Sequence, residues 1–353
     1  MFSFKIDVSE FNKLTPFFGS YIDILYKDRT AVICSENGQC YVQYMCPAFS
    51  TTPNDSVNVR LDTSLFTNMI LDGKVEVFVI DAEVSFSFYN DRDKLFYKTI
   101  VPKQVSYIDL QQKSDIFSRY KDADVFSFND YSYLARLCSK LKTPFVSSEG
   151  FCYTYYNKNY IFKKSTLPDF CVDSELLRKC ISITNEFAVV GDFLVFKNGS
   201  MSIILQKQKL PLMCDIPYIT SVKARRHVTL NISNLLSLLS KLRLKVNFST
   251  RLNLDASRCY IEAEQNRFEV PIEVMEDSSK SKSIDSLLSD LEKGLDDGLS
   301  KKESPNDSVL YLPYWLPKVV DRVSKCDLYI SKRFCVMKFN GINITIGGSL
   351  NAE

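Results

Sequence analysis

Histidine is almost absent from this sequence, because His227 is the only one among 353 residues. Glycine is scarce, with 11 residues, and tryptophan occurs once. A Ser-His-Asp triad, a zincin motif or a histidine metal cluster therefore has almost nothing from which to be built. No P-loop, G-x-S-x-G elbow or glycine-rich dinucleotide turn occurs either. We expect a protein that is not an enzyme and that holds no metal or cofactor.

Paired cysteines and long apolar runs are also missing. The eleven cysteines form no C-x-x-C pair, and this odd, scattered set indicates buried thiols in a reducing compartment. No stretch approaches the length of a membrane span, and the first residues lack a basic segment followed by an apolar core. We therefore expect a soluble protein inside the cell, with no membrane partner.

The composition that remains is that of a folded chain larger than one ordinary domain. Apolar residues make up 45% and aromatic residues 13%, which is enough for a full core and excludes a disordered or collagen-like chain. The net charge of +2 predicts no partner by itself. Any role in nucleic-acid binding must follow from where the charges lie.

One pattern recurs six times along the chain. It is a short alternating strand with a polar or acidic end, an amphipathic stretch of about nine to twelve residues, and two or three alternating strands joined by tight turns. The Glu36-Asn37-Gly38 turn of the first copy is a hairpin signal. The six openings lie at residues 4–11, 59–66, 126–130, 170–177, 228–233 and 310–315.

The six copies group into three pairs and predict three similar domains, at 1–115, 116–218 and 219–353. Each domain would hold two βαβββ units, an α+β arrangement in which antiparallel sheets cover one face and two helices the other. Linkers are predicted at 107–123 and 209–226, and the Arg225 to His227 segment is interpreted as a solvated basic turn that ends the second linker.

Residues 276–308 interrupt the repeats of the third domain. This segment carries nine acids and five lysines, a net charge of −4, and is predicted to be a flexible acidic insert. Apolar residues at helical spacing between Ile284 and Leu295 leave a second interpretation open, a short amphipathic helix that docks on a partner or on this chain.

Six strand-helix-strand units in three domains resemble the DNA polymerase sliding clamps, in the three-domain bacterial β-clamp form. The resemblance covers nearly the whole chain and depends on the repeat plan and on openings such as 170–177 and 61–66. It implies a homodimer that closes a ring of six domains, with sheets outside and helices inside. The ring would encircle double-stranded DNA without sequence specificity and tether a DNA polymerase after a clamp loader places it there.

The charge distribution is consistent with such a ring. The six predicted helix windows carry +8 together, which leaves −6 for the remainder of the chain. Both windows of the first domain are neutral, so the lining would not be uniformly basic. Positive side chains on the elements that line the hole suit a non-specific duplex binder, because phosphates supply the affinity. The residues expected to face DNA are Arg136, Lys140, Lys142, Arg178, Lys179, Lys241, Arg243, Lys245, Lys318, Arg322 and Lys325.

The resemblance also implies a groove for client peptides beside the linker between the second and third domains. Residues 215–222 are similar to the linker that edges this groove, and residues 149–153 to its opposite wall. The short tail ends in an acid and has one large apolar residue. The expected groove residues are Phe151, Tyr153, Ile216, Pro217, Tyr218, Val222 and Leu350; for each, a packed strand or linker side chain is about equally compatible with the sequence.

Three other classes of function are weighed against the ring. A monomeric, clamp-like polymerase accessory factor would bind DNA through an open basic face. An enzyme is disfavoured because carboxylate pairs such as Asp91 with Asp93 are explained as solvated surface acids. A structural all-β virion protein would not predict basic helices at matched repeat positions. Abundant Lys, Asn, Ile, Phe and Tyr suggest an AT-rich genome, and a large phage would fit the divergent sequence. The expected location is the cytoplasm of a bacterium or of a phage-infected host.

Overall fold

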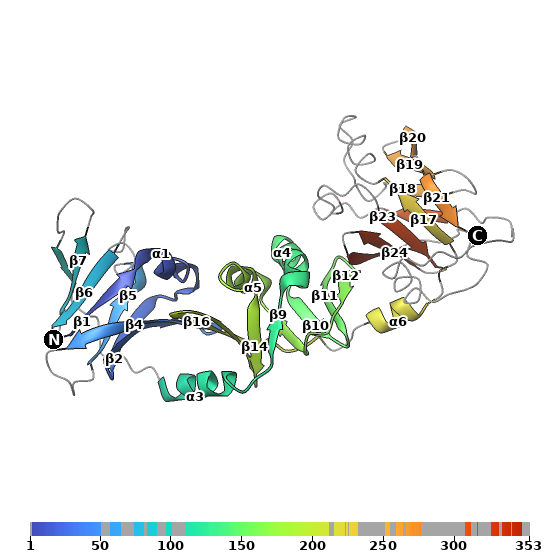
Figure 1. Ribbon diagram of the computed structural model, residues 1–353. Coiled ribbons are helices and arrows are strands. Elements are labelled where there is room, and N and C mark those ends of the chain that lie inside the picture. The colour runs from blue at the N-terminus through green and yellow to red at the C-terminus, as the bar shows by residue number, and fades with distance from the viewer. Residues whose placement is uncertain are drawn as a thin grey trace. The chain divides into compact units, whose positions relative to one another are not determined.

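The structure is a computed structural model, shown in Figure 1. It describes residues 2–50, 57–64, 74–80, 83–89, 97–100, 110–211, 215–222, 224, 226–231, 251–254, 259–263, 266–270, 272–276, 308–311, 316, 326–331, 334–339 and 341–347. The contacts divide the chain into two compact units. Unit 1 comprises residues 1–136 and 170–209, and unit 2 comprises residues 137–169 and 210–353.

Unit 1 is built on one twelve-stranded sheet. Its main order is β8-β7-β6-β1-β4-β16-β15-β14-β9, while β3 pairs with β4, β2 with β3, and β5 with β2. All of the registered neighbours are antiparallel, both those that follow one another through a tight turn, such as β2 and β3, and those far apart in the chain, such as β4 and β16. The strands are β1 (Phe2–Asp7), β2 (Tyr21–Lys27), β3 (Thr30–Glu36), β4 (Cys40–Ser50), β5 (Val57–Asp62), β6 (Lys74–Ile80), β7 (Glu83–Tyr89), β8 (Tyr97–Ile100), β9 (Val125–Ser127), β14 (Glu186–Val190), β15 (Phe193–Asn198) and β16 (Met201–Gln206).

Helices lie on both faces of this sheet. In Figure 1, α1 and α5 lie on one side of the sheet and α3 lies on the other. A further helix, α4, begins in unit 1 and continues into unit 2. The helical segments are α1 (Val8–Phe11), η1 (Thr15–Phe17), α3 (Leu110–Tyr120), η2 (Asn129–Tyr131), α4 (Ser132–Leu141) and α5 (Ser174–Ile181), and the short strand β13 (Phe170–Val172) precedes α5.

On the face of the sheet opposite α3, aromatic rings pack together in the core of unit 1. Phe128 stacks on Phe187 with ring centroids 4.3 Å apart, and Phe196 and Phe170 pack around the pair. All four rings are buried, which removes a large apolar area from water and fixes the strands that carry α5.

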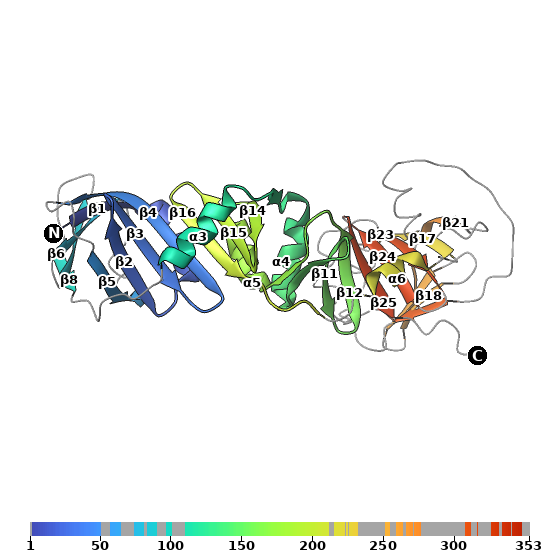
Figure 2. The same ribbon diagram turned by 90° about the horizontal axis from the view of Figure 1, so that it is seen from below.

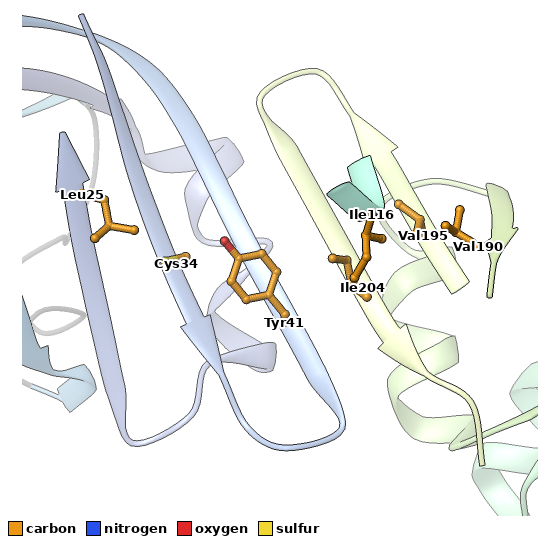
Figure 3. Packing of buried hydrophobic residues seen from close by; sticks show 7 residues of the cluster. All are labelled: Leu25, Cys34, Tyr41, Ile116, Val190, Val195 and Ile204. Carbon is orange, nitrogen blue, oxygen red and sulfur yellow. The ribbon is translucent and has the colours of Figure 1, made fainter. Parts of the chain in front are cut away.

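The other face of the sheet is covered by α3, which lies within the predicted linker at 107–123. Ile116 of α3 packs among buried side chains of six strands, including Tyr41, Val195 and Ile204 (Figure 3). Figure 2 shows α3 across this face of the sheet. Residues 110–120 of the predicted linker form a helix, because their apolar residues recur at helical spacing and bury one side of it.

Lysine side chains connect both ends of α3 to the sheet. Lys113 Nζ lies 2.8 Å from Glu36 Oε1 and 5.1 Å from the ring centroid of Tyr41. Near the other end, Lys197 Nζ of β15 lies 5.2 and 5.0 Å from the ring centroids of Phe117 and Tyr120. Burial, together with the charge of Lys121, lowers the pKa of Lys197. The helix is therefore attached by an ion pair and by cation–π contacts as well as by its apolar side.

Unit 2 contains a second antiparallel sheet with the order β10-β11-β12-β25-β24-β23-β17-β21 and a separate four-stranded sheet with the order β20-β19-β18-β22. The pairing of β12 with β25 joins segments far apart in the chain. The strands are β10 (Phe145–Ser148), β11 (Phe151–Tyr156), β12 (Asn159–Lys164), β17 (Arg226–Leu230), β18 (Arg251–Leu254), β19 (Cys259–Ala263), β20 (Asn266–Val270), β21 (Ile272–Glu276), β22 (Ser308–Tyr311), β23 (Cys326–Ile330), β24 (Phe334–Phe339) and β25 (Ile342–Gly347).

The second predicted linker also contains regular structure. Helix α6 (Ile216–Ser221) occupies part of it, and its start matches the preference of proline for the first helical turn. Residues 226–230 form β17 between β21 and β23, so the solvated basic turn expected around His227 was wrong for Arg226 and His227. Alternating apolar residues at Val228 and Leu230, both buried, explain why this segment enters the sheet.

His227 takes part in a polar cluster on this sheet. Its Nε2 lies 3.3 Å from Asp327 Oδ1, which also accepts a 2.7 Å hydrogen bond from Thr229 Oγ1. The imidazole stacks on the ring of Tyr329 at 4.8 Å. Burial alone would raise the pKa of the Asp327 carboxyl, but the hydrogen bonds and the nearby charges of His227 and Lys338 hold it below its ordinary value.

The α+β fold class predicted from the repeats is confirmed: in the described part of the chain, antiparallel sheets alternate with short helices. The three-domain boundaries at 115 and 218 stay a prediction beside the two compact units. Nine cysteines in the described part of the chain are buried and unpaired, as the sequence indicates for structural thiols. Within the described ranges, no helix has the length and apolar character that a membrane crossing needs.

Candidate nucleic-acid interface

The basic side chains of the second predicted domain are placed by two amphipathic helices. Helix α5 begins at Ser174 and is capped by Asp173, whose Oδ1 accepts a 2.8 Å hydrogen bond from the Leu176 backbone N–H. Its apolar side, with Leu177 and Cys180, is buried. The side of the helix that is left for solvent carries Arg178, which is exposed.

Helix α4 follows the same rule. Leu134 and Ala135 are buried, while Arg136 is exposed on the opposite side. The helix ends at Leu141, with Lys140 in its last turn, where a positive side chain interacts favourably with the helix dipole. Lys142 follows in the left-handed region at φ 56° and is also exposed.

The two arginines come together at one surface hollow. Arg136 of α4 and Arg178 of α5 line a hollow of about 240 Å³ with Ile181 and Ser182. Both guanidinium groups are permanently charged, and their planar donors match phosphate oxygens. The structure thus brings together two of the eleven residues that the sequence analysis expects to face DNA.

Lys179 is engaged differently from its neighbour Arg178. Its Nζ lies 3.4 Å from Glu175 Oε1 and donates a 3.3 Å hydrogen bond to the backbone oxygen of Pro16. It lines another hollow, of about 290 Å³, with polar residues that include Asn37 and Asp173. Its charge already serves contacts within unit 1, so its role toward DNA stays a prediction that this geometry does not favour.

Six of the expected DNA-facing residues lie outside the described residues: Lys241, Arg243, Lys245, Lys318, Arg322 and Lys325. Their role stays a prediction from the sequence.

The side of α4 that carries Arg136 also carries an aromatic residue that is absent from the expectations drawn from the sequence. Tyr133 of α4 is 36% exposed and lies three residues before Arg136, hence on the same side of the helix. Tyr133 carries no charge, so the net charge of its helix window does not reveal it. The sequence does contain a signal for Tyr133. An aromatic residue, an arginine and Lys140 follow one another at i, i+3 and i+7, which places them on one side of a helix.

The residues expected on one wall of the client groove are largely covered. Phe151 and Tyr153 of β11 are 8% and 2% exposed. Phe151 packs edge-on against Phe162 at 5.9 Å, and Tyr153 against Tyr160 at 6.0 Å. These rings contribute to the core of unit 2, and their role in a groove stays a prediction.

The residues expected from the linker divide between core and surface. Ile216 of α6 is fully buried, Pro217 and Val222 are half-buried, and Tyr218 is 55% exposed. Tyr160 Oη donates a 3.3 Å hydrogen bond to Asp215 Oδ2, which ties β12 to the residue before α6. Leu350 lies outside the described residues.

No protein-family model and no curated protein matches this sequence. Solved structures do match over almost the whole length. The DNA polymerase sliding clamp from Pseudomonas aeruginosa superposes with a TM-score of 0.65 and 9% identity, covering 99% of both chains. The beta subunit of DNA polymerase from Streptococcus pyogenes gives 0.65 and 11%, covering 99% of this chain and 100% of the other.

The beta chain of DNA polymerase III from Streptococcus pneumoniae gives a TM-score of 0.64 at 12% identity, with 99% of both chains covered. Such low identities show architecture, and the architecture agrees from end to end. The resemblance inferred from the six repeats is thereby confirmed at the level of the fold. The chain has the fold of the DNA polymerase sliding clamps.

Proposed function

We propose that this chain is a DNA sliding clamp, a processivity factor that encircles duplex DNA and tethers the replicative polymerase. The observation that carries the proposal is the match of the whole chain to solved sliding clamps, with nothing of substantial length left over on either side. A fold alone does not define a function, so a site must support it. That support comes from the two arginines that α4 and α5 bring to one hollow.

The mechanism needs no catalytic residue. A ring holds DNA topologically, and Arg136 and Arg178 interact with phosphates, which are the same at every base pair. Each contact exchanges one phosphate for the next at little cost, so the ring slides. Lys140 and Lys142, which are exposed at the end of α4, would add further phosphate contacts.

The ring would be closed by two copies of the chain. Within the described residues, β8 pairs only with β7, and β20 pairs only with β19. Such sheet edges present unpaired backbone N–H and C=O groups, which readily accept another strand. Pairing of β8 in one copy with β20 in the other, repeated by two-fold symmetry, would close a dimeric ring.

Clients would bind where the exposed ring of Tyr218 and the half-buried Pro217 and Val222 meet solvent. Aromatic side chains of this kind are frequent anchors in interfaces. The DNA polymerase and a clamp loader are the partners that this function requires. The place of action would be the cytoplasm of a bacterium or of a phage-infected host.

The test measures retention on DNA. Purified full-length protein is loaded with its clamp loader and ATP on nicked circular DNA, and complexes are separated from free protein by gel filtration at rising salt. A closed ring stays on the circle and leaves when the circle is linearised, because it slides off the ends. Equal loss from circular and linear DNA would contradict the ring and favour a monomeric accessory factor with an open basic face.

A further inference from the structure

Tyr133 gives the DNA-facing side of α4 a chemical feature that phosphate binding does not use. Its ring is 36% exposed, one helical turn from Arg136, and Arg136 shares a hollow with Arg178 of α5. Residues three apart on a helix are neighbours, with Cβ atoms about 5–6 Å from each other. On the surface of unit 1, a partly exposed aromatic ring therefore lies one helical turn from an arginine that shares a hollow with a second arginine.

An aromatic face has no partner in an intact duplex, where the bases stack on one another and only their edges and the phosphates are accessible. It has one in single-stranded DNA, because an unpaired base can stack on an aromatic side chain while its phosphate meets a positive group. Combined aromatic and basic side chains are the usual means by which proteins bind single strands without sequence preference.

We infer that Tyr133, Arg136 and Arg178 form a binding site for an unpaired nucleotide of single-stranded DNA. The base stacks on Tyr133 and the adjoining phosphates interact with the two arginines. The inference rests on the proposed function and extends it, since the same surface then binds both the duplex and a single strand that continues from it. Binding is independent of base identity, because every base has a π-face.

The experiment measures fluorescence anisotropy of a labelled oligothymidine and of a labelled duplex with full-length protein. For Tyr133→Ala we expect at least about fivefold weaker binding of the single strand, the loss that one base stack accounts for, with duplex binding changed by less than a factor of two. Tyr133→Phe retains the aromatic face and should bind both probes like the wild type. Tyr21→Ala removes a ring of similar exposure, 40%, from β2 and serves as the matched control.

A second measurement does not depend on how a variant folds. Wild-type protein is irradiated with an oligonucleotide that carries 5-iodouracil, and the cross-linked peptide is identified by mass spectrometry. A cross-link at Tyr133 supports the site. Cross-links confined to other peptides, single-strand binding by Tyr133→Ala equal to that of the wild type, or no single-strand binding at all would each overturn it.

The two proposals fail separately. If the protein is retained on circular DNA but Tyr133 has no influence on single-strand binding, only the present inference is wrong. If the protein binds the single strand through Tyr133 but is lost equally from circular and linear DNA, the site stands and the closed ring is wrong.

Discussion

Arg136 and Arg178 line the same hollow although they belong to different helices and to different repeats of the chain. Neither residue is near the other in sequence, and each is positioned by the buried side of its own helix. Their convergence is the geometric basis of the proposed contact with DNA phosphates. Because each arginine lies on its own helix, either one can be substituted without changing the other.

The first prediction concerns salt dependence. Replacing both arginines with alanine should weaken duplex binding and reduce the slope of log affinity against log salt by about 1.8, because each lost phosphate contact accounts for about 0.9. The measurement is a titration of labelled duplex over a series of salt concentrations. Arg119→Ala is the control, since this exposed arginine lies on α3 at the opposite face of the sheet; an equal loss in that variant would show that only net charge matters.

The second prediction concerns α3. Ile116→Ala should lower the free energy of unfolding of unit 1 by about 2–4 kcal/mol, because it leaves a cavity among Tyr41, Val195 and Ile204. Urea denaturation followed by circular dichroism measures the change. Ser114→Ala, at an exposed position of the same helix, should stay within about 0.5 kcal/mol of the wild type. Similar effects of both substitutions would mean that α3 is not attached through its buried side.

The third prediction concerns pH. The pKa of Asp327 is lowered in the folded state, so its ionised form contributes stability above the unfolded value of 3.8, and this contribution is lost as pH falls through the lowered folded value. Asp327→Asn should cost about 1.5–3 kcal/mol at neutral pH, the scale of a hydrogen bond to a charged group, and its urea midpoint should fall less steeply in acid. A curve parallel to that of the wild type would contradict this; Asp124→Asn, at an exposed carboxylate, should give such a parallel curve.

The fourth prediction concerns the cysteines. Burial raises the pKa of Cys152 and Cys171 to about 11 and that of Cys40 and Cys46 to about 12, which leaves little reactive thiolate at mildly alkaline pH. Iodoacetamide should therefore leave these thiols unmodified in the native protein and modify them in urea. Peptide mapping by mass spectrometry tests this. Rapid native labelling of any of the four would show that its strand opens readily.

The repeat pattern predicted most of the fold because it depends on periodicity, which the local sequence contains. The opening at 170–177 became β13 and α5 with Asp173 as the cap, as its polar strand end indicates. Residues 110–120 lie within a predicted linker between two repeat pairs, and they form α3. Their helix is stabilised by the sheet beneath Ile116, a contact that no local pattern contains.

The candidate site was predicted less completely, because charge counting does not say which contacts a side chain makes. Arg136 and Arg178 meet at one surface, whereas Lys179 of the same helix interacts with Glu175 and Pro16. Tyr133 carries no charge and was not considered. The sequence also does not distinguish a buried apolar residue from one that lines a groove. Three of the expected groove residues are buried in the structure: Phe151, Tyr153 and Ile216.

Strand β4 has a mechanical consequence. It is hydrogen-bonded to β3 of the first repeat and, through five residue pairs from Met201 with Tyr44 to Leu205 with Cys40, to β16 of the fourth repeat. The first and second repeat pairs are thus joined by a continuous β-ladder, and α3 packs across this junction. A continuous ladder resists hinge rotation of one side against the other and can bend only gradually. Curvature that the protein needs in this part of the chain must already be present in the twist of its strands.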